Sequence, residues 1–313
     1  MAESKTAVLA ALLGNGALAV LKGTAAAFTG SAAMLAETFH SVADTGNQAL
    51  LFLGMRLGQR PPDERHPFGH GKDVYFWAFV VAMMLFSLGG AFAIWEALRK
   101  FLHPNGGEQE SLIWAYGVLA GGFVFESISL GVAIHAVVKA KGGDSLRQYW
   151  RDNRDPTLPT VLLEDSAALV SLVVAAGGLA LSQATGSFFW DGMASGAIGV
   201  LLLGVAVFLA VENYSLLIGE AAPRDVEAAI QKVARVDEAV VAVVGLQTMH
   251  IGPRDILVVL DLHFRQDLLA PCIETAITRL QQRIKQALGD STNARLIVIE
   301  PARPDAARFG VAA

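Results

Sequence analysis

Long apolar stretches, each bounded by polar or charged residues, fill the first two thirds of the chain. A helix needs about 20 mostly apolar residues to cross roughly 30 Å of membrane hydrocarbon. Six stretches reach that length, so the pattern predicts a six-helix transmembrane bundle. The predicted spans are Thr6–Phe28, Ala32–Met55, Val74–Leu98, Leu112–Val138, Thr157–Leu181 and Phe188–Val211.

After Tyr214 the pattern becomes that of a soluble domain. The predicted order of helix, strand, strand, helix and strand suits an α+β sheet with both helices on one face. We therefore expect a transport domain over 1–215, a cytosolic domain over 216–302 and a disordered tail over 303–313. The predicted elements of the cytosolic domain are the helices Asp225–Ala234 and Leu268–Leu288 and the strands Ala239–Thr248, Asp255–Phe264 and Arg295–Ile299.

Composition supports an integral membrane protein. Of the 313 residues, 53% are hydrophobic and 17% charged, with a mean hydropathy of +0.46; soluble domains carry about 25% charged residues. A net charge of −5 gives no reason to expect a nucleic-acid partner. The single cysteine, Cys272, excludes an internal disulfide and, near a helix start, fits a buried apolar position. The first apolar stretch shows no small-residue cleavage pattern, so no cleavable signal peptide is expected.

Lysine and arginine predict the orientation of the spans, since both favour cytoplasmic loops. The loop after the second span holds four of them and the loop after the fourth span holds five. On the opposite side only Arg99 and Lys100 occur. Both termini are therefore expected in the cytosol, with the protein in a bacterial-type inner (plasma) membrane. In the last span, Gly192 and Gly199 predict close helix packing.

Ionisable side chains at membrane depth are costly, so each is a functional candidate. In the second span His40 and Asp44 are one helical turn apart and lie on one face. An imidazole and a carboxylate in that arrangement can bind one zinc-type cation. The alternative is a buried histidine–aspartate pair that joins two helices. Asn47 and Gln48 either line the path of the ion or form hydrogen bonds between helices.

The fifth span contributes adjacent Glu164 and Asp165, and the fourth contributes Glu126. Successive helical residues point about 100° apart, so Asp165 is chosen as the ligand, with Glu164 as a flanking ligand or proton carrier. At 1.5 Å per residue, Asp44 lies roughly 16 Å, Asp165 roughly 12 Å and Glu126 roughly 18 Å from the cytosolic ends of their spans. A shared depth favours one site, although a hydrogen bond that Glu126 accepts from Ser127, Ser129 or another helix is equally compatible.

A cytosolic loop with the sequence PPDERHPFGHGKD offers a second set of possible ligands. Asp63, His66 and His70 are three and four residues apart, so a folded turn would bring them together. Solvated loop charge is the alternative.

Several of these segments resemble the cation diffusion facilitator family, in a branch that contains an animal mitochondrial zinc-transporter relative. The resemblance covers nearly the whole chain and lies in TGSAAMLAETFHSVADTGNQALL, HPFGHGKD, LLEDSAAL and LLIGEAAP. It implies a homodimeric metal/proton antiporter with six spans and a ferredoxin-like cytosolic domain. It also implies transport ligands from the second and fifth spans.

By position, His40, Asp44 and Asp165 match family ligands, whereas the fourth ligand falls on Val161, which cannot bind a metal. Glu126, Glu164 or water would then supply the missing oxygen. The loop residues match a metal site of some members. Lys72 matches a lysine paired near the dimer axis, and Glu220 is a possible substitute for its missing acidic partner. Histidine positions that bind zinc in the cytosolic domain of relatives fall on Val244, Asp261 and Ile299, so we expect that site to be lost.

The sequence thus predicts a divalent cation exporter, with Zn²⁺ as the transported ion and protons as the counter-ion. One imidazole and two carboxylates suit zinc, cobalt or iron better than magnesium or calcium, and manganese is a further alternative. An intramembrane metallohydrolase is a rival interpretation, but no HExxH motif occurs in any span. A metal sensor that has lost transport is the other rival, because of Val161. No enzyme activity is expected.

Overall fold

The computed structural model describes residues 2–29, 32–102, 112–143, 145, 146, 149, 154–187, 189–289 and 292–303. Residues 304–313, most of the expected disordered tail, lie outside them. The chain forms two compact units. One unit comprises Met1–Leu57, Asp73–Arg151 and Asp155–Tyr214, and the other comprises Gly58–Lys72, Asp152–Arg154 and Ser215–Ala313.

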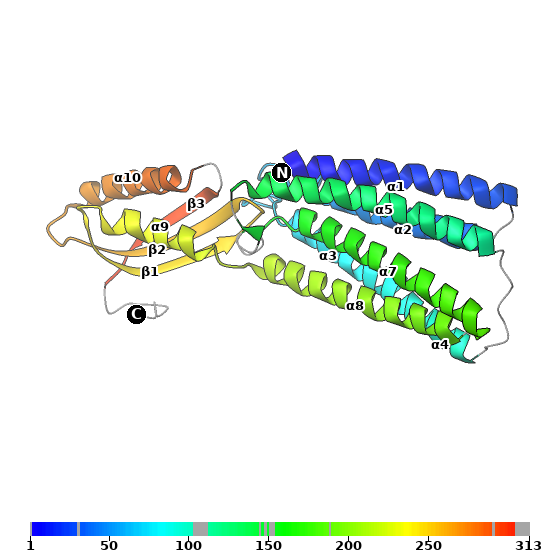
Figure 1. Ribbon diagram of the computed structural model, residues 1–313. Helices are drawn as coiled ribbons and strands as arrows, with labels where there is room; N and C mark the ends of the chain where they lie inside the picture. The colour runs from blue at the N-terminus through cyan, green and yellow to red at the C-terminus, as the bar shows by residue number, and fades with distance from the viewer. Residues whose placement is uncertain are drawn as a thin grey trace. The chain divides into compact units, whose positions relative to one another are not determined.

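The first unit is a bundle of long helices (Figure 1). Helices α2 and α5 both contact α1, and α7 contacts α1, α3 and α5. Helix α2 also contacts α3 and α5, so α2, α5 and α7 lie close enough for a shared polar site. The elements are α1 Ala2–Thr29, α2 Ala32–Leu57, α3 Asp73–Met84, the π-helical segment η1 Leu85–Ala91, α4 Phe92–Leu102, α5 Leu112–Lys141, α7 Thr157–Thr185 and α8 Phe189–Ile218.

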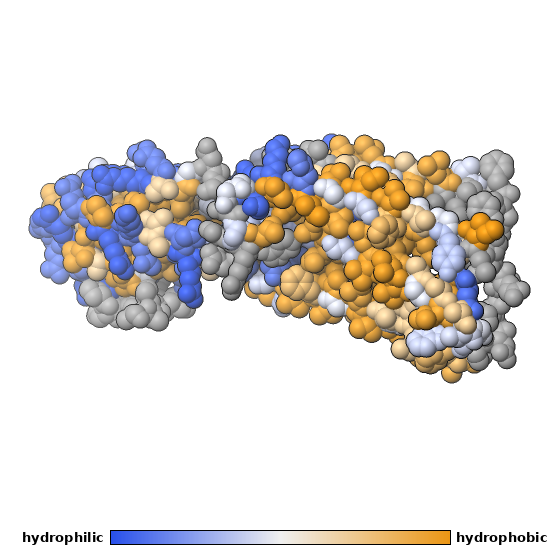
Figure 2. All heavy atoms as spheres, in the orientation of Figure 1, coloured by the Kyte–Doolittle hydropathy of each residue, from blue (hydrophilic) through white to orange (hydrophobic). Residues whose placement is uncertain are grey.

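Four of the described helices are long and apolar enough to cross a membrane: Asp73–Leu102, Ala115–Lys141, Thr157–Thr185 and Phe189–Ile218. They correspond to the third to sixth predicted spans. In α1, the apolar helical part is shorter and covers Ala7–Leu21. Spanning by α1 and α2 therefore stays a prediction. Large apolar side chains are exposed along the bundle, as lipid contact requires, and Figure 2 shows them covering most of its visible face.

Glycines bring α8 against η1 and α4. A Cβ atom on Gly199 would lie 2.8 Å from the side chain of Ile94, and one on Gly90 would lie 2.6 Å from that of Leu203. Gly192 similarly faces Phe101 at 3.1 Å. The small residues of the last span therefore serve close packing, as the sequence predicts.

The second unit has the predicted order of helix, strand, strand, helix and strand (Figure 1). Strands β1 and β2 are antiparallel, and β2 and β3 are parallel, in the order β1-β2-β3. Alternate residues of β2 are buried in a core shared with α9 and α10, which contact each other. The elements are α9 Arg224–Arg235, β1 Val240–His250, β2 Asp255–Phe264, α10 Ala270–Leu288 and β3 Asn293–Pro301.

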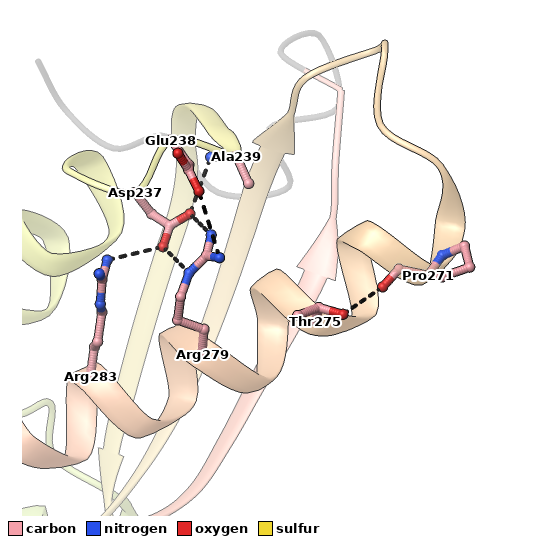
Figure 3. A network of polar contacts seen from close by, with 7 residues as sticks. All are labelled: Asp237, Glu238, Ala239, Pro271, Thr275, Arg279 and Arg283. Atoms are coloured by element: carbon pink, nitrogen blue, oxygen red, sulfur yellow. Dashed lines mark hydrogen bonds and ion pairs between the residues drawn. The ribbon is translucent and has the colours of Figure 1, made fainter.

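An ion-pair network joins the turn between α9 and β1 to α10 (Figure 3). The side chain of Asp237 is fully buried and accepts hydrogen bonds from Arg279 at 2.6 and 2.9 Å and from Arg283 at 3.3 Å. Asp237 also accepts a hydrogen bond from the backbone N–H of Ala239 at 3.1 Å. The Arg279 bonds, above all, lower the pKa of Asp237 below its usual range.

The loop Gly58–Lys72 packs on this unit at the β1–β2 turn. A Cβ atom on Gly71 would overlap the backbone carbonyl oxygen of Ile251, so only glycine allows this approach. Lys72 donates hydrogen bonds to the carbonyl oxygens of Leu217 at 3.1 Å and Ile218 at 3.4 Å.

Two expectations for this unit differ from the structure. Glu220 forms an ion pair with Arg154 at 3.3 Å, whereas the ammonium group of Lys72 donates to backbone carbonyls. Cys272 is exposed, because it lies in the first turn of α10 on the face away from the core.

Candidate metal sites

Two adjacent carboxylates of α7 are buried among neutral polar groups of its neighbours. Glu164 is 7% exposed and Asp165 is 3% exposed. Glu164 accepts hydrogen bonds from the amides of Asn47 at 2.6 Å and Gln48 at 3.4 Å, both on α2. Asp165 accepts one at 2.8 Å from the hydroxyl of Ser129 on α5. The two carboxylates therefore contact different helices, as their 100° separation requires.

Two further carboxylates act on this pair. Asp44 of α2 interacts electrostatically with both Glu164 and Asp165, and Glu126 of α5 interacts with Glu164. The hydroxyl of Ser127 donates to the backbone carbonyl of Phe123, and that of Ser129 donates to Asp165. Carboxylates from three helices thus share one region inside the bundle.

The side chain of His40 lies outside the described residues. Its backbone belongs to α2, one turn before Asp44. Its coordination together with Asp44 therefore stays a prediction.

Position 161 of α7, where the family pattern would place a ligand, is part of the apolar core. Val161 is 1% exposed and packs in a cluster with Val8, Leu51, Val81 and Ala133. No polar group replaces the missing ligand at this position. Any fourth protein ligand must come from elsewhere in the carboxylate region.

From sequence alone, Asn47 and Gln48 have only a general predicted role as polar residues of a span. The structure places both against Glu164. The available signal was their spacing, since they follow Asp44 by three and four residues and so share its helix face.

The loop residues Asp63, His66 and His70 form a compact cluster. Their ligand atoms all lie within 4.8 Å of one another, and this is the only such group of three or more found in the described part of the chain. The Oδ2 atom of Asp63 lies 3.0 Å from Nε2 of His70, and Oδ1 lies 3.3 Å from Nδ1 of His66. Two imidazoles and a carboxylate are a ligand set typical of zinc.

Asp63 also organises the loop. Its Oδ1 atom accepts hydrogen bonds from the backbone N–H groups of Arg65 at 2.9 Å and His66 at 2.6 Å. The contact with His70 and the backbone bond from His66 lower the pKa of Asp63 to about 2. Asp63 is therefore ionised at neutral pH and available to a cation.

The C-terminal unit contains two further histidines, His250 and His263. The Nδ1 atom of His250 lies 3.4 Å from the Gly252 carbonyl, and burial lowers the pKa of His250 to about 4. The Nδ1 atom of His263 lies 3.1 Å from the Ala302 carbonyl. Within the ranges that the structure describes, neither histidine joins a group of three ligands.

Comparison with known proteins identifies similar chains. Residues 8–218 match the cation efflux transmembrane domain. The mitochondrial proton-coupled zinc antiporter SLC30A9 of Xenopus laevis is 36% identical over 247 residues, which cover 78% of this chain and 44% of the relative. Metal tolerance protein C4 of Arabidopsis thaliana is 35% identical over 254 residues, covering 80% and 55% respectively. The chain thus matches about half the length of these relatives.

Proposed function

Since the chain belongs to the cation efflux, or cation diffusion facilitator, family, we propose that it exchanges a divalent metal ion, with zinc as the main substrate, for protons. The observation that carries this proposal is the carboxylate region of a multi-pass membrane protein. The hydrogen bonds that Glu164 and Asp165 accept come from neutral amides and a hydroxyl. When these carboxylates are ionised, their neutral donors leave the negative charge uncompensated, which favours a bound cation.

We assign the transport site to His40 and Asp44 of α2 and Asp165 of α7. Glu164 takes the place of the ligand missing at Val161, because it is buried in the same region and interacts with Asp44. Glu126 is the alternative source of that oxygen. One imidazole with carboxylates suits zinc, and cobalt, iron or manganese are the alternative substrates.

Competition for these groups supplies the coupling. Imidazole must be neutral and carboxylates ionised to bind a metal. Protons that arrive from the outer side therefore displace the ion there, and the metal leaves the cytosol as protons enter. The similarity to relatives named as proton-coupled zinc antiporters supports this coupling of metal and proton movement. This exchange makes and breaks no covalent bond, so we propose a transporter rather than an enzyme.

For the architecture we propose that α1 and α2 also cross the membrane, which gives six spans over 1–215. The C-terminal unit, over 216–302, would be a ferredoxin-like domain in the cytosol, where both termini lie. The positive loops support this orientation in a bacterial inner membrane. A homodimer is proposed from the family. The loop cluster of Asp63, His66 and His70 would be a second, cytosolic zinc site.

The experiment is zinc flux into liposomes that contain the purified protein, driven by an imposed pH gradient. Asp44→Ala and Asp165→Ala should abolish zinc flux and the accompanying proton movement. A matched control is Glu96→Ala, which removes a carboxylate of α4 that bonds to Arg99 of the same helix at 2.8 Å. That variant should keep wild-type flux. Full coupled flux by Asp44→Ala would refute the assignment of the site.

A further inference from the structure

Two buried amides beside Glu164 have oxygen atoms that no described residue pairs with. Asn47 is 4% exposed and Gln48 is 1% exposed. Each turns its NH₂ group to the Glu164 carboxylate. An ionised carboxylate accepts hydrogen bonds and donates none. Within the part of the chain that the structure describes, the buried oxygens Oδ1 of Asn47 and Oε1 of Gln48 have no hydrogen-bond partner. Because both ends of an amide belong to one planar group, these oxygens lie beside the carboxylate region.

An unpaired buried oxygen destabilises a protein, so its retention calls for an explanation. Here two of them follow Asp44 by three and four residues, on the helix face that carries the predicted metal ligands. The opposite contribution is missing, since Val161 is part of the apolar core. The region thus lacks one ligand on α7 and has two free oxygen acceptors on α2.

Amide carbonyl oxygens are established ligands of divalent cations, alongside carboxylates. We infer that Asn47 and Gln48 bind the transported divalent cation through their side-chain oxygens, next to Glu164. This inference rests on the proposed transport function and adds two ligands to it. The cation then contacts an oxygen-rich α2 surface beside Glu164, which itself substitutes for the ligand lost at position 161.

Paired substitutions separate a ligand role from a purely supporting one. Asn47→Leu removes both ends of the amide, whereas Asn47→Asp keeps oxygen acceptors and removes the donor to Glu164. We expect Asn47→Leu to raise the KM for zinc about tenfold or more, the usual range for losing a metal-site group. Asn47→Asp should restore a KM near that of the wild type. Gln48→Leu and Gln48→Glu form a second pair if one Asn47 variant fails to fold.

A buried amide elsewhere provides the control. Asn213 of α8 is fully buried and also has an unpaired oxygen, but its nitrogen donates to the Leu209 carbonyl of its own helix. Asn213→Leu should leave the KM for zinc unchanged.

The inference is wrong if Asn47→Asp is as impaired as Asn47→Leu, because the amide then acts only as a donor to Glu164. It is also wrong if both leucine variants keep the wild-type KM. Asp44→Ala, measured in the same liposomes, tests the transport site separately. Loss of flux in Asp44→Ala with a normal Asn47→Leu would refute the ligand role alone, whereas normal flux in Asp44→Ala would refute the proposed function.

Discussion

Replacing Asp237 with alanine should loosen α10 from the turn that follows α9. The substitution removes one carboxylate that accepts hydrogen bonds from Arg279, Arg283 and the backbone of Ala239 (Figure 3). All these donors lose their acceptor at once. The effect should be local, because the network joins the α9–β1 turn to α10 within the C-terminal unit.

The magnitude follows from the burial of the partners. Removing one member of a buried ion pair costs about 3–5 kcal/mol when the remaining charge stays buried. The Asp237 side chain is 0% exposed, but those of Arg279 and Arg283 are 34% and 51% exposed, so water can solvate both guanidinium groups in the variant. The expected loss in the free energy of opening is therefore below that range, about 1.5–3 kcal/mol, which is typical of hydrogen bonds between charged groups.

Hydrogen–deuterium exchange of the full-length protein in detergent measures this loss, through the protection of peptides in α10 and β1. The control is Asp267→Ala, which removes an exposed aspartate bonded to Arg265 in the same unit. Exposed ion pairs contribute little, so its peptides should exchange like those of the wild type. Equal protection in Asp237→Ala and Asp267→Ala would show that the network does not stabilise the unit.

Acidification should weaken the C-terminal unit through His250, whose pKa falls from 6.5 to about 4 in the folded state. Between these pH values the unfolded chain binds one more proton than the folded chain, so up to about 3 kcal/mol of stability is present above pH 6.5 and lost as the pH falls to 4. Hydrogen–deuterium exchange of β1 at pH 7 and pH 5 measures this loss. His250→Phe should flatten the dependence of stability on pH. Gly90→Val places a side chain against Leu203, so it should destabilise the protein by about 1–3 kcal/mol of overpacking and lower its unfolding temperature. The control Gly131→Val, at a position with open space, should pack without overlap. His70→Ala should remove one bound zinc per chain in calorimetry at neutral pH while coupled flux in liposomes continues, and unchanged stoichiometry would contradict the loop site.

Much of the C-terminal unit follows from its sequence pattern. The predicted strand Asp255–Phe264 has the observed bounds of β2, since every second residue enters the core. The predicted helix Leu268–Leu288 begins two residues before α10 and ends at the same residue. It was predictable because Ala276, Leu280 and Ile284 share one buried face. In both elements a strong period left a single way to bury the apolar side chains.

The polar partners could not be predicted in the same way. Spacing indicated that Glu164 and Asp165 face different directions, but not that Asn47 and Gln48 of α2 would bind Glu164. Glu220 pairs with Arg154, whose position depends on tertiary packing rather than on nearby sequence. Contacts between distant segments depend on helix rotation, which a periodic pattern fixes only where one face is strongly apolar.

The π-helical segment η1 divides the third span between two sets of neighbours. Helix α3, before it, contacts α2 and α7, whereas Ile94 and Phe101 of α4, after it, face the glycines of α8. Deleting one residue from Leu85–Ala91 would turn everything beyond by about 100° and draw it in by 1.5 Å. Ile94 and Phe101 would then swing away from Gly199 and Gly192. The number of residues in the π-helical segment thus sets the rotation of α4 relative to α3. That rotation determines which helix each half of the span can contact.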